Sequence, residues 1–175
     1  MRRLNNWSSP DVEKLRGQFA SIHKKSPNIS EKQALQKIIN QQAFKSGMVG
    51  AITSLGGFYT LPIALPVDMV LSTQIQSTIV QFIASAYGVE VDNELSYRVR
   101  TYIVTTGSTQ VTERTTRYLM KFALRMSGRS FAKLIPLIGA FIGFTVNYFI
   151  AQTTARVAME WYAQQAKQQQ LTSSK

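Results

Sequence analysis

The sequence predicts an all-α protein, a single-domain helical bundle of about five to seven helices with glycine- and proline-interrupted apolar segments. Apolar residues recur at steps of three and four along most of the chain, which is the spacing of one helix face. Alternation of apolar and polar residues, the pattern of a strand, does not extend over a useful length. A chain of 175 residues has the usual size of one domain and can bury a core.

The first two helices are expected in a basic N-terminal region, residues 1–44. Pro10 suits the first turn of one helix, which Pro27 should end. A second helix start at Ser30 has capping-box form, because Gln33 follows three residues later. We therefore expect two short helices separated by a turn.

A helical core is predicted over residues 45–162, followed by a polar C-terminal tail, residues 163–175, that frays. Within this core, residues 46–67 contain four glycines and two prolines, of which Gly56-Gly57 and the prolines should break any helix. A helix over 69–87 should end at Gly88. Further helices are expected after residue 92, over the basic segment 111–133, and from Pro136 past Trp161.

The net charge of +11 points to an anionic partner such as a membrane surface or nucleic acid. The clearest basic feature is a set of cations spaced three, four, four and four apart, which places them on one face of a helix. A solvated face is the plain interpretation; contact with anionic lipid headgroups is the functional one. These residues are Arg114, Arg117, Lys121, Arg125 and Arg129.

Residues 134–155 carry no charge and are long enough to span a bilayer. Four small or polar residues spaced by four form a narrow stripe in this segment: Gly139, Gly143, Asn147 and Ala151. Such a stripe permits close helix packing in a membrane or in a soluble core. Pro136, Asn147 and the glycines favour the packing helix of a soluble or peripheral protein, with an apolar ligand cavity as the alternative.

Asp68 is the one charged residue between Lys45 and Glu90. We expect a structural role for this acid, as a cap or first-turn acid of the helix over 69–87. The alternative is a buried carboxylate paired with Arg100, Arg156 or a ligand group.

No pattern in the sequence predicts catalysis. The chain has no cysteine and one histidine, so common thiolate and histidine metal motifs cannot form. His23 is expected at the end of a short helix, and the segment around Gly57 lacks the lysine of a phosphate-binding loop. We therefore expect a non-enzymatic protein without a metal or other cofactor.

Two stretches resemble the EcsC family. Pro66, Asp68, Tyr87 and Gly88 match a Pro-x-Asp step into a helix that ends in Tyr-Gly. A later Pro-x-x-Gly-Ala segment that leads to Asn-Tyr is matched by Pro136, Gly139, Ala140, Asn147 and Tyr148. The resemblance covers residues 45–162 and implies a bacterial, mostly helical protein tied to membranes or transport. It implies no catalytic residues.

Together these patterns predict a membrane-associated protein, or one that binds a lipid or other apolar ligand, linked to a membrane or transport assembly. The polar start of the chain has no apolar run typical of a signal peptide, so we expect a cytoplasmic protein, peripheral at the inner face of the membrane. The alternatives are a soluble adaptor between proteins and a pore-forming or membrane-inserting protein. Nucleic acid is the least expected partner.

Overall fold

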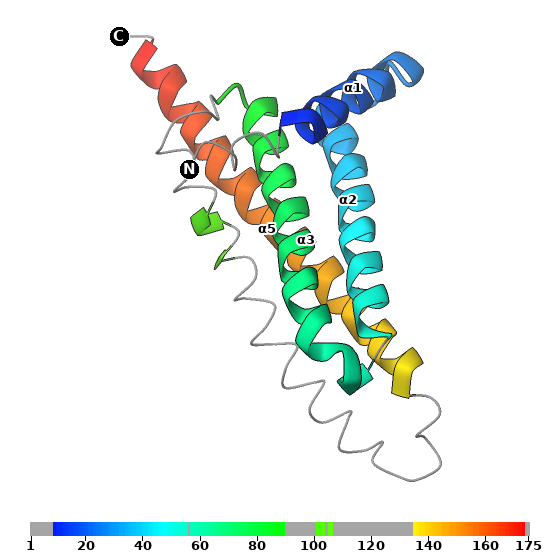
Figure 1. Ribbon diagram of the computed structural model, residues 1–175. Helices are drawn as coiled ribbons and strands as arrows, with labels where there is room; N and C mark the ends of the chain where they lie inside the picture. The colour runs from blue at the N-terminus through cyan, green and yellow to red at the C-terminus, as the bar shows by residue number, and fades with distance from the viewer. Residues whose placement is uncertain (1–8, 56, 90–100, 104, 107–134, 174–175) are drawn as a thin grey trace.

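The computed structural model describes residues 9–55, 57–89, 101–103, 105–106 and 135–173. Its labelled helices are α1 (Ser9–Lys25), α2 (Glu31–Ser54), α3 (Gly57–Ala86) and α5 (Ile135–Ser173). No residue in these ranges belongs to a strand. The prediction of an all-α protein is therefore confirmed for the described part of the chain (Figure 1).

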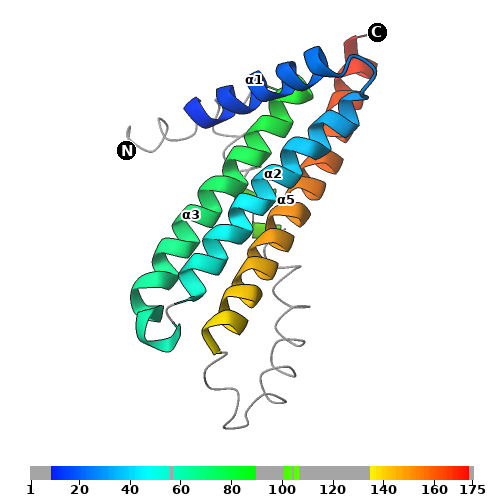
Figure 2. The same ribbon diagram turned by 90° about the vertical axis from the view of Figure 1, so that its right-hand side faces the viewer.

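Helices α2, α3 and α5 lie side by side, and α1 lies across one end of α2 and α3 (Figures 1 and 2). The most extensive contact is between α2 and α5, which run in opposite directions because Gly50 meets Gly143 and Ser54 meets Gly139. At the end away from α1, the end of α2, the start of α3 and the start of α5 come together (Figure 1).

Two predicted helix ends are confirmed by the backbone. Ser30 accepts a hydrogen bond from the Gln33 backbone N–H at 3.2 Å, and the Gln33 side chain accepts one from the Ser30 N–H at 3.2 Å. This reciprocal capping box satisfies N–H groups that a helix start leaves unpaired. Gly88 has a φ of 72°, a left-handed conformation that glycine adopts without strain and that ends α3 after Ala86.

The helix break predicted at Gly56-Gly57 is confirmed, because α2 ends at Ser54 and α3 begins at Gly57, whereas the break predicted at the two prolines is wrong. Helix α2 continues to Ser54, and α3 begins at Gly57 and includes Pro62 and Pro66. The fixed φ of proline, about −65°, is itself helical, so a proline costs its own hydrogen bond and a local clash without excluding the helix. Contacts of α3 with both α2 and α5 offset that cost.

The position of Asp68 corrects its expected role as a helix cap. Because α3 begins at Gly57, Asp68 lies well inside the helix, away from the N–H groups that a cap satisfies. Its side chain lies outside the described residues.

The predicted boundaries also differ from the helices. Residues 44 and 45 both lie within α2, so the boundary between the N-terminal region and the core falls inside one continuous helix. The tail over residues 163–175 was expected to fray, yet α5 continues to Ser173. Alanine, glutamine and lysine dominate this stretch and favour helix, and buried Tyr162 fixes its start.

The apolar core lies toward α1, where side chains from α1, α2, α3 and α5 meet. It is formed by Leu15, Ile38, Ile39, Ile79, Phe82, Ile83, Ala155 and Ala158, among others. The polar side chains of Gln76 and Gln81 on α3 are buried as well. Helix α3 packs against three helices, so it buries more than the single stripe that its apolar residues predict.

Candidate functional site

The closest approach between helices is the crossing of α2 and α5 at Gly50 and Gly143. A Cβ atom added at either glycine would come within 3.0 Å of the other glycine's backbone carbonyl group. A Cβ at Gly47 would meet the ring of Phe144 at 2.8 Å, and one at Gly139 would meet the Ser54 carbonyl oxygen at 3.0 Å. The two backbones are therefore nearly in contact, which only glycine permits.

The predicted stripe on α5 lies at this crossing. Gly139 and Gly143 face α2, and the Asn147 side chain lies beside Gly50. Ala151 and Asn147 are both buried. Of the two predictions for this stripe, close helix packing and an apolar ligand cavity, the geometry matches close packing. A pocket lies elsewhere, between α1, α2 and α3, and none of the four stripe residues lines it.

Toward α1 from the crossing, amide side chains join the same two helices. The Gln152 Nε2 group donates to Asn40 Oδ1 at 2.7 Å and to the Tyr148 hydroxyl at 3.3 Å. Gln36 Nε2 donates to Asn40 Oδ1 at 2.9 Å and to Gln152 Oε1 at 3.4 Å. This network links α2 to α5 through exposed and partly buried amides, so it adds to the contact at the glycine crossing.

Large apolar side chains are exposed from the middle of α2, α3 and α5 toward the end of the molecule away from α1. Ile52 on α2 is 63% exposed and Phe141 on α5 is 71% exposed. We call this surface the apolar end and define it by nine exposed residues: Phe44, Met48, Ile52, Leu55, Val70, Leu71, Leu137, Phe141 and Phe149. A ring contact of Phe144 with Phe44, at a centroid separation of 5.5 Å, joins α5 to α2 along this surface. Within α5, Phe144 also stacks on Tyr148 at 5.9 Å.

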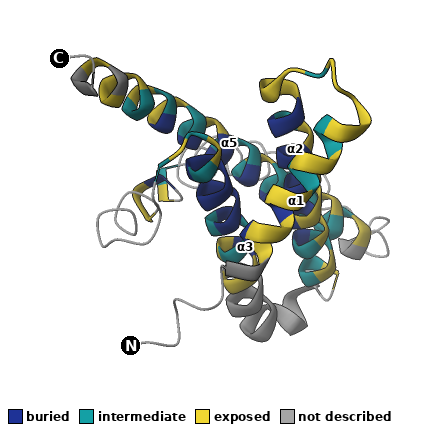
Figure 3. Ribbon diagram, turned by 90° about the horizontal axis from the view of Figure 1, so that it is seen from above, coloured by how far each residue is buried: buried dark blue, intermediate teal, exposed yellow. Residues whose placement is uncertain are grey.

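The interior beside the apolar end is small and polar. Ser46, Ser72 and Asn147 are buried there, together with the glycines of the crossing. Toward α1 the arrangement is the reverse, since the core is apolar and the charged side chains, such as Lys37 and Arg156, are exposed. Figure 3 shows buried residues on the inner faces of the three helices and exposed residues outside. Among the described residues, the half toward α1 thus has an apolar core and a charged surface, with Gln76, Gln81 and Thr154 also buried. The half at the apolar end has the inverted polarity, with exposed large apolar side chains over buried small and polar ones.

The apolar end has a definite depth. Leu137 and Phe149 are 12 residues apart on α5, which is about 18 Å at 1.5 Å per residue. The hydrocarbon core of a bilayer is about 30 Å thick, so the apolar end matches roughly one leaflet. Among the described residues, α5 also contains one stretch long and apolar enough to span a membrane, Leu137–Gln169, of whose most apolar window only 17% is buried.

The apolar end was only partly anticipated from the sequence. The uncharged segment of α5 was singled out, but Phe44, Met48 and Ile52 on α2 were not. Their spacing by four is the signal of one helix face, and it was missed because the stripe of this helix was read from Leu35, Ile38 and Ile39 alone.

The remaining predicted site residues give little chemistry. The cations Arg114, Arg117, Lys121, Arg125 and Arg129 lie outside the described residues. His23 lies in the last turn of α1, as the sequence predicts. Its Nδ1 is 3.2 Å from the Phe19 carbonyl oxygen and its ring contacts the Phe19 ring, and these are contacts within one helix. Within the described ranges no group of three or more histidine, cysteine or acidic residues could hold a metal ion.

No family model, curated protein or solved structure matches this chain.

Proposed function

We propose that this protein associates with membranes by inserting its apolar end into one leaflet of the bilayer. The inverted polarity of that half supports the proposal, because nine large apolar side chains are exposed while serine, asparagine and glycine fill the interior. Exposed apolar surfaces of this extent mark interaction sites, and small residues are typical of helix contacts in lipid. The depth of about 18 Å fits one leaflet, which makes the protein peripheral.

A lipid environment accounts for the surface better than a single docked protein. The exposed apolar residues come from α2, α3 and α5 and point away from the interior that these helices share. A docked protein covers one face, whereas lipid acyl chains contact every outward face at a given depth. Between Leu137 and Phe149, α5 has no charged residue, and Lys45 is the one charged residue between Phe44 and Leu55 on α2, at the edge of the apolar end nearer α1; burial in hydrocarbon disfavours charge.

Several parts of this function rest on the sequence. The basic face from Arg114 to Arg129 would add attraction to anionic headgroups. The resemblance to the EcsC family agrees with a membrane-linked bacterial protein, and the absence of a catalytic motif supports a non-enzymatic role at the cytoplasmic face. A complete bundle of five to seven helices stays a prediction for the whole chain.

Vesicle flotation of Phe141→Asp tests the proposal. Phe141 is 71% exposed, so the change should leave the fold intact while removing about 2 kcal/mol of apolar transfer and adding the cost of inserting a carboxylate. Partitioning into phosphatidylcholine vesicles should weaken by at least about thirtyfold. Leu171→Asp is the matched control, since Leu171 is 69% exposed on the same helix but near its other end, and it should partition like the unmodified protein.

Equal partitioning of the two variants would contradict insertion through the apolar end. If the unmodified protein ignores vesicles yet copurifies with a protein partner, and Phe141→Asp removes that partner, the apolar end belongs to an adaptor. Release of a trapped dye from the vesicles would instead indicate a pore-forming protein.

A further inference from the structure

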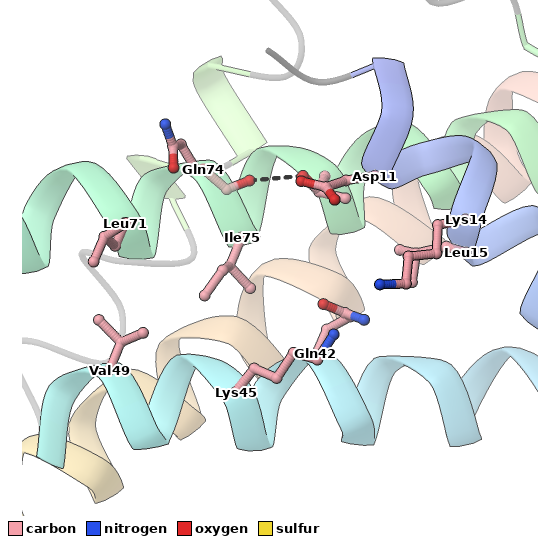
Figure 4. Close-up of a pocket in the computed structure, with 10 residues that line it drawn as sticks. Asp11, Lys14, Leu15, Gln42, Lys45, Val49, Leu71, Gln74 and Ile75 are labelled. Carbon is pink, nitrogen blue, oxygen red and sulfur yellow. Dashed lines mark hydrogen bonds between the residues drawn. The ribbon is translucent and has the colours of Figure 1, made fainter. Parts of the chain in front are cut away.

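A hollow of about 180 Å³ lies between α1, α2 and α3 (Figure 4). For comparison, an engineered cavity of about 150 Å³ holds a benzene molecule. One side of the hollow is polar, with Asp11 and Lys14 from α1 and Gln42 and Lys45 from α2. The other side is apolar and includes Val49 and Leu71, the second of which belongs to the apolar end. The hollow therefore joins the charged half of the molecule to the apolar end.

The polar side of the hollow is suited to a single negative charge. Lys14 and Lys45 come from different helices, and within the described part of the chain neither forms an ion pair. In Figure 4 their side chains and the Gln42 amide extend into the same space between α1 and α2. Two lysines and Asp11 give a local net charge of +1, which balances a phosphodiester, and the ammonium and amide N–H groups are donors to phosphate oxygens.

The order of groups along α2 matches the order of groups in a phospholipid. Val49 follows Lys45 by one helical turn in the direction of the apolar end, a rise of about 6 Å. An anionic headgroup at the lysines would thus place its acyl chains beside Val49 and Leu71, where they continue along the exposed apolar surface. Lys14 and Lys45 lie at the edge of the apolar end, where the anionic surface of a membrane would attract lysine side chains.

We propose that this hollow binds the phosphodiester headgroup of an anionic phospholipid, with the acyl chains lying along Val49 and Leu71. The proposal rests on the membrane association proposed above and adds a preference among lipids. It assigns Lys14 and Lys45 to the phosphate, Gln42 to one of its oxygens, and Asp11 to limiting the site to a singly charged group.

Flotation with two kinds of vesicle tests the preference. The double variant Lys14→Gln, Lys45→Gln is compared with Lys24→Gln, Lys25→Gln, which removes the same charge from exposed residues at the other end of α1. At one fixed salt concentration, the unmodified protein should bind phosphatidylcholine vesicles more tightly once phosphatidylglycerol is added. The hollow variant should lose about twentyfold in binding to the mixed vesicles and keep its binding to phosphatidylcholine, whereas the control should keep most of the preference. An equal loss in both variants would overturn the site, since it would show general charge attraction.

A titration without membranes separates this site from the proposed insertion and from a free-anion site. Amide chemical shifts are followed while short-chain phosphatidylglycerol, below its micelle concentration, is added to the unmodified protein. Shifts at Gln42, Val49 and Leu71 that disappear in the hollow variant support the lipid site even if vesicle insertion fails. Inorganic phosphate that shifts Gln42 as strongly as the lipid does, or a lipid that shifts none of the three, would overturn it.

Discussion

Replacing Gly143 with alanine should destabilise the protein, although alanine normally favours a helix. In an open helix interior this change stabilises by about 0.5–1 kcal/mol. At Gly143 the new Cβ would come within 3.0 Å of the Gly50 carbonyl oxygen and the Ser54 hydroxyl, and ordinary contact begins at 3.4 Å. The helices must therefore separate by more than 0.4 Å, the difference of those two distances.

That separation has a definite energetic consequence. A gap of about 0.5–1 Å loses a quarter to a half of each dispersion contact across it, and overpacking typically costs about 1–3 kcal/mol. Because the neighbouring atom is backbone, a change of side-chain rotamer cannot relieve the clash. Subtracting the helix gain leaves an expected net loss of about 1–2 kcal/mol in the free energy of unfolding.

Urea unfolding of the lipid-free protein, followed by far-UV circular dichroism, measures this loss. Gly17→Ala is the control, because Gly17 lies inside α1 with nothing within 4 Å of an added Cβ, and it should stabilise by about 0.5–1 kcal/mol. The double variant Gly50→Ala, Gly143→Ala should lose less than the sum of its single changes, since one separation of the helices accommodates both methyl groups. A Gly143→Ala protein as stable as the unmodified chain would refute the close crossing.

Three further changes test other parts of the fold. Ser30→Ala removes the acceptor of the capping box and should lower the free energy of urea unfolding by about 1 kcal/mol; an unchanged midpoint would contradict the cap. Gly88→Ala places a Cβ at a φ of 72° and should cost about 1–2 kcal/mol in thermal unfolding, with Gly88→Asn costing less; equal losses would argue against the left-handed turn. Ile83→Ala empties a site that is 0% exposed and should cost about 2–5 kcal/mol in urea unfolding, whereas Val70→Ala, at 55% exposure, should change little; similar losses would place Ile83 outside the core.

Local rules predicted the features that depend on a few neighbouring residues. The capping box at Ser30 and the glycine stop at Gly88 were both predicted because each needs only backbone geometry and one or two side chains. The stripe of small residues on α5 was predicted as a packing surface, but its partner could not be identified from local spacing. That partner is α2 at Gly47, Gly50 and Ser54.

Rules about helix breakers failed where tertiary contacts outweighed them. Pro62 and Pro66 lie within α3, and the glycines of α2 lie within a continuous helix. Gly47 and Gly50 weaken a helix taken alone by about 1 kcal/mol each, yet they let α5 approach closely. The sequence does not show which helix lies opposite these glycines, so the packing energy that they permit cannot be compared with their loss of helix propensity.

By itself the sequence determined the helical class, the starts of α1, α2 and α5 and the fact that residues 134–155 carry no charge, because these follow from local composition and spacing. Only the tertiary structure decided what that uncharged segment faces. Its first half lies beside the glycines and exposed apolar residues of α2, whereas Gln152 in its second half bonds to Asn40, close to charged Lys37 on the same helix. The exposed apolar residues of α5 therefore extend over about 18 Å, from Leu137 to Phe149, because the surroundings of each residue depend on which part of α2 packs beside it.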